Sequence, residues 1–421
     1  MNPQYFNQTH LLNGQSRSLR VNNSDDIEIL DVTVYFSLSC DSMVSENQAL
    51  ISFKGDFEDA YFTSLGLTFS SRVGWYKYIK TRPGDVNGFF NILLPPSGEL
   101  EMVLDCWLST GDVILNYFFV LRNKPLVDLS LVRDVSRYES YTWNSLADFI
   151  ESDDLSSGCH SIGVEGLYFD FIYSRLDGCP LLCHLHGNAP RSPDYKLPAF
   201  NGWNITSGLN CSILLFSDPL LYMDPQLELS WHSGCESFSV QLIYELIIKK
   251  LNSVSKFKDF IFFGGSGGGY ASLYLASKFK HSTAFVWNPQ TSILSYEPDS
   301  VDKFFNTCFG LYSQHELINC NGRLIIDLFA GVDLTGVKIL YLQNITDWHV
   351  QCHLLPFLHA HGLQVDSEEF SGWLSPTFYL HLKEMSSGHE PPPSVIIRGI
   401  LEVLTSSSDS FFHADAFFIA D

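Results

Sequence analysis

The sequence predicts an α/β domain, a mostly parallel sheet with flanking helices, preceded by an all-β, sandwich-like domain. Between about residues 25 and 121, short apolar runs alternate with period two and are broken by turn residues, with almost no helical period. From about residue 165 onward, apolar strands alternate with helical segments, which is typical of a parallel sheet. A chain of 421 residues is also long enough for two domains.

The amino-terminal domain is expected to span residues 1–150, because the polar, acidic stretch 122–160 is typical of a connection between domains. Val32, Val34 and Phe36 would lie on one face of its first long strand. Further strands are expected at 50–53, 89–94, 101–108 and 113–121. This pattern indicates an antiparallel sandwich or jelly-roll-like module, for which glycan binding and a purely structural or interface role are equal alternatives.

The second domain, residues 151–421, shows the strand and helix alternation. Strands are expected at 166–173, 180–186, 212–216, 259–263, 283–287, 338–343 and 363–370. A crossover helix is expected over 236–251, with Lys249 and Lys250 at its carboxyl end, where cations complement the helix dipole.

The chain is acidic, since 25 Lys and Arg against 47 Asp and Glu give a formal net charge of −22. This charge disfavours nucleic acid and anionic membrane surfaces as partners, because both bind Lys and Arg. The amino terminus lacks the basic and apolar segments of a secretory signal, and no stretch approaches the roughly 18 apolar residues of a membrane helix. We therefore expect a soluble, cytoplasmic protein without a membrane span, whose ten cysteines are reduced.

A glycine-rich turn, Gly264 to Gly269, carries the strongest functional signal. It follows a short buried strand and precedes a helix expected over 270–279, so Ser266 would lie on a sharp turn between strand and helix. Glycines two before and two after the serine remove Cβ atoms that would collide in such a turn. This context predicts a nucleophile, with the amide of Gly267 donating to a developing oxyanion.

Two other kinds of glycine-rich loop are alternatives for this turn. A nucleotide-binding P-loop would end in Gly-Lys-Ser/Thr, which is absent here. A dinucleotide fingerprint, Gly-x-Gly-x-x-Gly, is partly permitted because so many positions are glycine, but it normally stands at the start of its domain. The strand, turn and helix order therefore favours the nucleophile.

A serine nucleophile needs a carboxylate and then a histidine later in the chain. Asp347 lies just after the strand at 338–343, at the carboxyl edge where parallel sheets hold functional groups, so it is the predicted acid. Asp327 and Asp333 precede that strand and are weaker candidates.

The predicted base is His389, which stands in a loop before a proline run and a helix expected over 395–404. His349 is too close to Asp347 in sequence to bridge it to the serine, so it is expected to line the pocket instead. His353, His359 and His361 are assigned to the following helix.

Substrate-side residues are expected near the strand at 180–186. Gly187 or Asn188 would supply a second oxyanion amide, and His186 would contact substrate. A zinc site from Cys179, Cys183, His184 and His186 is the disfavoured alternative, since alternating strand positions face opposite sides. No metal is expected.

Cations and aromatic residues supply the remaining candidates. Arg191 and Lys196, rare cations in a proline-rich loop, would meet an anionic donor or sugar, or belong to a solvated loop. Trp231 and Trp287 could stack on a sugar ring or pack in the core, and Asn288 and Gln290 could bind the substrate with them.

Four stretches resemble a known bacterial group: His186-Gly187 with 197–200, 217–219 with 229–231, 263–270 with 287–290, and Asp347 through His389. Across about residues 165–400 the chain resembles the α/β-hydrolase-fold surface-glycan proteins, namely capsular-polysaccharide biosynthesis proteins and accessory secretion-system glycan O-acetyltransferases. The resemblance implies a triad of Ser266, Asp347 and His389. It also implies association with glycan-synthesis or secretion machinery.

We therefore expect serine acyl transfer through an acyl-enzyme, most of all O-acetylation of a surface glycan or capsular polysaccharide. Carbohydrate or carboxyl ester hydrolysis uses the same residues and stays open, as does a non-catalytic hydrolase-like scaffold. The expected partner is a glycan or an acylated small molecule. No bound cofactor is expected, and acetyl-CoA is the candidate acyl donor.

Overall fold

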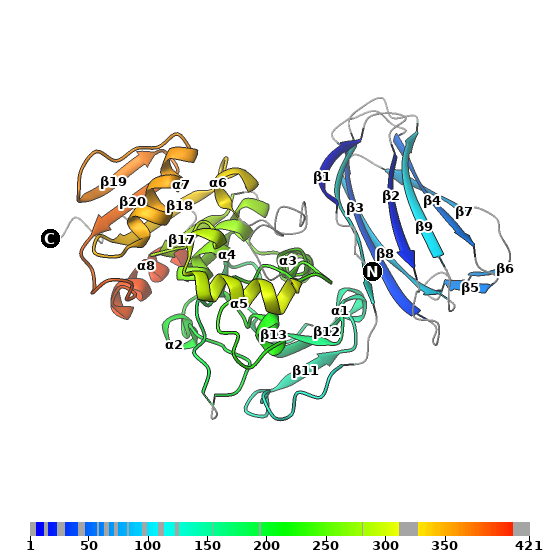
Figure 1. Ribbon diagram of the computed structural model, residues 1–421, viewed down its shortest axis with the longest axis horizontal. Helices are drawn as coiled ribbons and strands as arrows, with labels where there is room; N and C mark the ends of the chain where they lie inside the picture. The colour runs from blue at the N-terminus through cyan, green and yellow to red at the C-terminus, as the bar shows by residue number, and fades with distance from the viewer. Residues whose placement is uncertain are drawn as a thin grey trace.

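A computed structural model describes residues 6–11, 16–22, 30–40, 47–56, 59–62, 67–70, 75–81, 84–94, 99–107, 113–122, 126–153, 155–192, 195–279, 281–310 and 327–406. Its largest element is a ten-stranded sheet with helices on both faces (Figure 1). The chain is therefore mixed α/β, with a mostly parallel sheet.

The amino-terminal strands form two other sheets, both antiparallel. One has the order β1-β10-β3-β8-β5-β6 and the other β2-β9-β4-β7. The strands are β1 (Phe6–Leu11), β2 (Ser16–Asn22), β3 (Leu30–Cys40), β4 (Asn47–Asp56), β5 (Asp59–Phe62), β6 (Leu67–Ser70), β7 (Trp75–Thr81), β8 (Gly84–Leu94), β9 (Glu99–Trp107) and β10 (Val113–Arg122). Tyr35 stacks on Phe119 with ring centroids 5.0 Å apart, which joins β3 to β10.

The large sheet has the order β11-β12-β13-β15-β14-β16-β17-β18-β20-β19. Its strands are β11 (Ser140–Trp143), β12 (Gly158–Val164), β13 (Leu167–Ser174), β14 (Leu181–Leu185), β15 (Ser212–Phe216), β16 (Phe260–Gly265), β17 (Thr283–Trp287), β18 (Lys338–Asn344), β19 (Phe370–Ser375) and β20 (Phe378–Lys383). From β15 to β20 neighbouring strands are parallel. The carboxyl ends of β14, β16, β17, β18 and β20 therefore meet at one edge.

Helices cover both faces because the strands are apolar on both sides. Phe262 packs with the side of α3 and α4, and its neighbour Phe263 packs with the side of α8. The helices are α1 (Leu146–Glu151), α2 (Trp203–Thr206), α3 (Val240–Ser255), α4 (Ser266–Lys278), α5 (Pro298–Phe309), α6 (Leu328–Gly331), α7 (Leu355–Ala360) and α8 (Ser394–Ser406). Single turns at Pro219–Tyr222 and Ile293–Ser295 and a π-helix at Val350–Leu354 complete the described elements.

Several boundaries differ from the sequence predictions. The strand expected at 363–370 is wrong, because β19 begins only at Phe370 and runs antiparallel to β20, which was not predicted. Helix α3 runs to Ser255, so Lys249 lies more than a turn before its end, and Lys249 pairs instead with Glu245 at 3.6 Å. The helix ends where Lys256 turns left-handed, with φ at +53°, and its amide donates to the carbonyl of Asn252 at 2.9 Å.

The first strand of the large sheet lies before residue 150. Strand β11 pairs with β12, so residues 140–143 already belong to the large sheet. The two parts touch where the backbone amide of Arg122 donates to the carboxylate of Glu165 at 2.6 Å. The change from one sheet system to the other therefore falls between β10 and β11.

Candidate active site

The turn between β16 and α4 holds Ser266 in a left-handed conformation, with φ at +54°. A Cβ atom at Gly268 would collide with the backbone carbonyl of Leu185, and one at Gly265 would collide with the indole of Trp287. These glycines let the turn pack directly against β14 and β17, so Ser266 stands at the carboxyl edge of the sheet.

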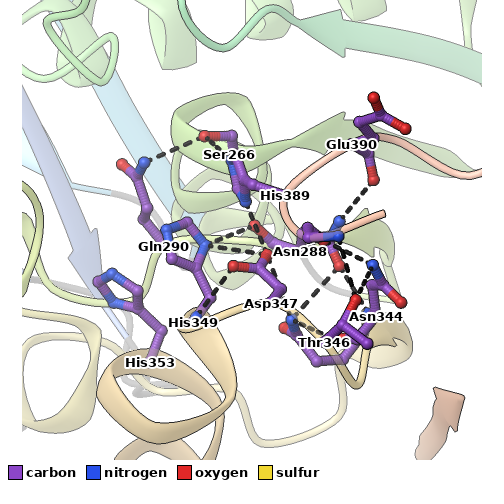
Figure 2. Close-up of polar contacts among 12 residues, drawn as sticks. Ser266, Asn288, Gln290, Asn344, Thr346, Asp347, His349, His353, His389 and Glu390 are labelled. Carbon is purple, nitrogen blue, oxygen red and sulfur yellow. Dashed lines mark hydrogen bonds and ion pairs between the residues drawn. The ribbon is translucent and has the colours of Figure 1, made fainter. Parts of the chain in front are cut away.

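A continuous chain of hydrogen bonds joins Ser266 to His389 and Asp347 (Figure 2). Nε2 of His389 lies 2.9 Å from Oγ of Ser266, and Nδ1 lies 2.7 Å from the carboxylate of Asp347. Asp347 follows β18 and His389 follows β20, so two loops far apart in sequence meet beside the serine. This geometry allows the imidazole to accept the serine proton while its other nitrogen stays bound to a carboxylate.

The carboxylate of Asp347 is arranged to stay charged. Burial alone would raise its pKa, but hydrogen bonds from His389 and from the backbone amide of His349, at 3.0 Å, hold that pKa below its ordinary value. An ionised carboxylate can only accept, so it requires a proton on Nδ1 of His389. The lone pair of Nε2 then faces the serine hydroxyl.

Two asparagines fix the loops that carry the acid and the base. The side-chain carbonyl of Asn288 accepts from the backbone amide of Asn344 at 2.7 Å, and its amide group donates to the backbone carbonyl of Glu390 at 3.0 Å. Its backbone carbonyl is 3.1 Å from Nδ1 of His349. Asn288 was predicted to bind substrate, but it is buried and ties these loops together instead.

Asn344 adds further hydrogen bonds to the loop that carries His389, and we call the hydrogen bonds of Asn288 and Asn344 to these loops the asparagine clasp. Its side-chain amide donates to the carbonyls of Ser386 at 2.7 Å and Gly388 at 2.5 Å. The amide of Gly388, whose φ is +55°, donates in turn to the hydroxyl of Thr346 at 3.0 Å. Sequence reasoning missed Asn344, although a polar residue at the end of an apolar strand was the available signal.

Gln290 makes a second side-chain contact to Ser266. Its Nε2 donates to Oγ of Ser266 at 3.0 Å, and its backbone amide donates to the carbonyl of Ser266 at 3.1 Å. The indole of Trp231 donates to Oε1 of the same side chain. Because an indole N–H can only donate, it identifies the oxygen of this amide and turns the NH₂ group toward the serine.

The loop after β14 lies against Ser266 and forms one wall of the site. A Cβ atom at Gly187 would lie 3.3 Å from Cβ of Ser266 and 3.7 Å from the amide nitrogen of Gly267. Within the described part of the chain, the amides of Gly187, Asn188 and Gly267 have no hydrogen-bond acceptor. Such free amides beside a nucleophile suit the binding of a developing oxyanion.

His186 lies behind this wall and not on its surface. Burial lowers its pKa to about 4, so the ring is neutral. One ring nitrogen donates to the carbonyl of Gly187 at 2.7 Å and the other accepts from the amide of Asp218 at 3.1 Å. Its predicted contact with substrate is therefore replaced by a role in holding the Gly187 loop.

The other predicted substrate residues divide into two groups. Trp231 is fully buried and Trp287 nearly so, so neither offers a face to a sugar. Arg191 reaches the carbonyl of Leu221 at 3.4 Å, and none of its described hydrogen bonds involves the triad. His349 does lie at the site, with its ring centroid 4.1 Å from that of His389.

Asp347, His349 and His389 also bring three ligand atoms within 4.8 Å of one another. Nδ1 of each histidine faces a carboxylate or carbonyl oxygen, whereas the buried Nε2 of His349 has no hydrogen-bond partner among the described residues. Cys183 and His184, from the zinc alternative, face opposite sides of β14: Cys183 packs in the core toward α3 and α4, and His184 packs on Phe263 and Gly202.

Solved structures with a similar chain path share little sequence identity with this chain. The capsule O-acetyltransferase of Neisseria meningitidis serogroup A matches with a TM-score of 0.43 and 16% identity, covering 58% of this chain and 96% of that one. The glycosylation-associated Gap123 complex of Streptococcus agalactiae matches with 0.38 and 14%, over 92% and 65%. TT1662 of Thermus thermophilus matches with 0.37 and 13%, over 60% and 100%.

No protein-family model matches the sequence, and no curated protein sequence does. These distant likenesses concern the fold, so the function has to be inferred from the side chains of the site. In the described residues, every helix is too short or too polar to cross a membrane.

Proposed function

We propose that this chain is a serine acyltransferase that works through an acyl-enzyme formed on Ser266. The observation that carries the proposal is the hydrogen-bonded chain from Asp347 through His389 to Ser266. Following the sequence resemblance to glycan O-acetyltransferases, we propose a sugar hydroxyl as the acceptor and an acetyl ester or thioester, such as acetyl-CoA, as the donor.

In the first half of the reaction, Oγ of Ser266 attacks the acyl carbonyl while its proton passes to Nε2 of His389. The carbonyl oxygen becomes an oxyanion beside the amides of Gly267 and of Gly187 or Asn188, which are free to donate. The bond to the alcohol or thiol leaving group then breaks, and that group takes the proton from His389.

The second half reverses these steps with a new nucleophile. The acceptor hydroxyl gives its proton to His389 as its oxygen attacks the acyl carbon, and Oγ of Ser266 leaves and recovers the proton. Water can replace the acceptor, in which case the chain is an esterase. The His389 side chain is 33% exposed, so acceptors can reach it from solvent.

Labelling with a fluorophosphonate tests the nucleophile. We expect the folded wild-type chain to be labelled, Ser266→Ala to lose labelling, and Ser277→Ala, at the far end of the same helix, to keep it. A folded wild-type chain that resists the reagent would support the non-catalytic scaffold instead. Incubation with acetyl-CoA and glycans, followed by mass measurement of the sugar and of free acetate, separates transfer from hydrolysis.

A further inference from the structure

Trp348 is an exposed tryptophan directly after the acid of the triad. Its side chain is 41% exposed, whereas Trp231 and Trp287 beside the same site are buried. An exposed indole next to Asp347 offers an apolar ring face on which a ligand of the site can pack.

The ring of Trp348 contacts the rings of Tyr296, His349 and His353. It stacks on Tyr296 with centroids 5.8 Å apart and planes 24° apart, and it meets His349 edge-to-face at 4.4 Å. His349 in turn lies 4.1 Å from His389, the proposed base. The orientation of the Trp348 ring is therefore fixed by its neighbours, and only the imidazole of His349 separates this aromatic surface from His389.

The charges around this surface argue against an anionic ligand. Burial, Glu297 and Asp347 all raise the pKa of Tyr296, and the charged groups that act on His349 and His353 are Asp347 and other histidines. Among the described residues, no lysine or arginine acts on these three side chains. The phosphates of a nucleotide donor would find no counter-charge here.

A pyranose ring fits these conditions because it is uncharged, has an apolar C–H face and carries hydroxyls at its edge. We infer that the exposed face of Trp348, backed by Tyr296, binds a neutral pyranose of the sugar that accepts the acyl group. The inference rests on the proposed function for its reaction. A sugar stacked on Trp348 would lie one imidazole away from His389, which takes the proton of the acceptor hydroxyl as described above.

Competition between sugar and water for the acyl-enzyme provides the main test. The full chain would cleave 4-nitrophenyl acetate in the presence of methyl glucoside, methyl galactoside or N-acetylglucosamine, with acetylated sugar and free acetate measured by mass spectrometry. The ratio of transfer to hydrolysis is the readout, so a general loss of activity cancels.

Trp348→Ala should raise the sugar concentration that half-saturates this ratio about tenfold, as expected for loss of one stacking contact. Trp348→Phe should keep most of the affinity. Trp203→Ala is the matched control, since Trp203 is 44% exposed but lies on α2. Equal half-saturation in Trp348→Ala and wild type would overturn the inference.

A binding measurement keeps the inference testable if the chain has no esterase activity, which would overturn the proposed function alone. Sugars should quench the tryptophan fluorescence of Ser266→Ala, and the quench should vanish when Trp348→Phe is added. Absence of any sugar-dependent quench would overturn the sugar site. A Trp348-dependent response to CoA would instead assign the surface to the donor. Trp348→Ala could also weaken the binding of a butyrate ester without changing that of the acetate ester or of the sugar. That result would overturn the sugar site and assign the surface of Trp348 to the acyl chain of the donor.

Discussion

The contact between Gln290 and Ser266, the proposed nucleophile, leads to a prediction that can be measured by kinetics. Gln290 is completely buried, and its amide bridges the indole of Trp231 and Oγ of Ser266. Gln290→Glu keeps the shape of the side chain and keeps an oxygen for the indole to donate to. It replaces the NH₂ group that faces the serine with a carboxylate oxygen, which cannot donate when ionised.

The size of the effect follows from what the NH₂ group donates to. In the ground state it meets a neutral hydroxyl. In the proposed mechanism the serine oxygen becomes more negative while its proton passes to His389, before the charge moves to the carbonyl oxygen, and the hydrogen bond is stronger at that stage. Hydrogen bonds to charged groups contribute about 1.5–3 kcal/mol. Their loss in the transition state corresponds to a decrease in kcat of roughly 10- to 150-fold.

The pH dependence separates this positioning role from a structural one. Burial raises the pKa of a carboxylic acid, and a protonated Glu at position 290 could again donate to Ser266. The rate of Gln290→Glu relative to wild type should therefore recover as the pH falls from 8 to 6, measured with 4-nitrophenyl acetate.

Gln290→Leu serves as the comparison. It removes both contacts, leaves the indole N–H of Trp231 without an acceptor, and should lower the free energy of unfolding by about 1–3 kcal/mol. Its relative rate should show no recovery at low pH. If Gln290→Glu stays within twofold of wild type across this range, Gln290 does not assist the serine.

Two further predictions concern the clasp and the buried histidines. Asn288→Asp replaces the group that donates to the carbonyl of Glu390 with an oxygen that repels it, so kcat for 4-nitrophenyl acetate should fall about tenfold or more, while Asn306→Asp on exposed helix surface should not change it. Burial lowers the pKa of His349 to about 4 and that of His353 to about 3, so below the ordinary value of 6.5 the unfolded chain binds more protons than the folded one. The free energy of unfolding should therefore not depend on these two groups above pH 6.5. Below it, each such histidine should lower the free energy of unfolding by about 1.4 kcal/mol per pH unit down to pH 4. A urea midpoint that does not change between pH 7 and 5 would contradict this.

The local sequence pattern was sufficient to predict the position of residues whose placement depends on their own backbone conformation. Glycines around Ser266 are needed wherever a strand turns sharply into a helix, so the turn could be recognised without any knowledge of its neighbours. Asp347 and His389 followed from the rule that loops after parallel strands share one edge. Their contacts at 2.7 and 2.9 Å have the geometry that this prediction requires.

The substrate side was predicted less well. Trp231 and His186 follow apolar runs, and sequence periodicity cannot tell whether such a ring faces solvent or the core. In the structure, Trp231 fixes the amide of Gln290 and His186 fixes the loop at Gly187. Trp348, which no sequence pattern singled out, has the exposed ring next to Asp347.

The sequence by itself determined the α/β class, the turn that presents Ser266, and the chain order of Ser266, Asp347 and His389, because each depends on local conformation or on polarity along one strand. Only the tertiary structure decided how Gln290, Asn288 and Trp348 are used. Their contacts join loops that follow different strands, and those loops meet only because the sheet places β16, β17, β18 and β20 side by side.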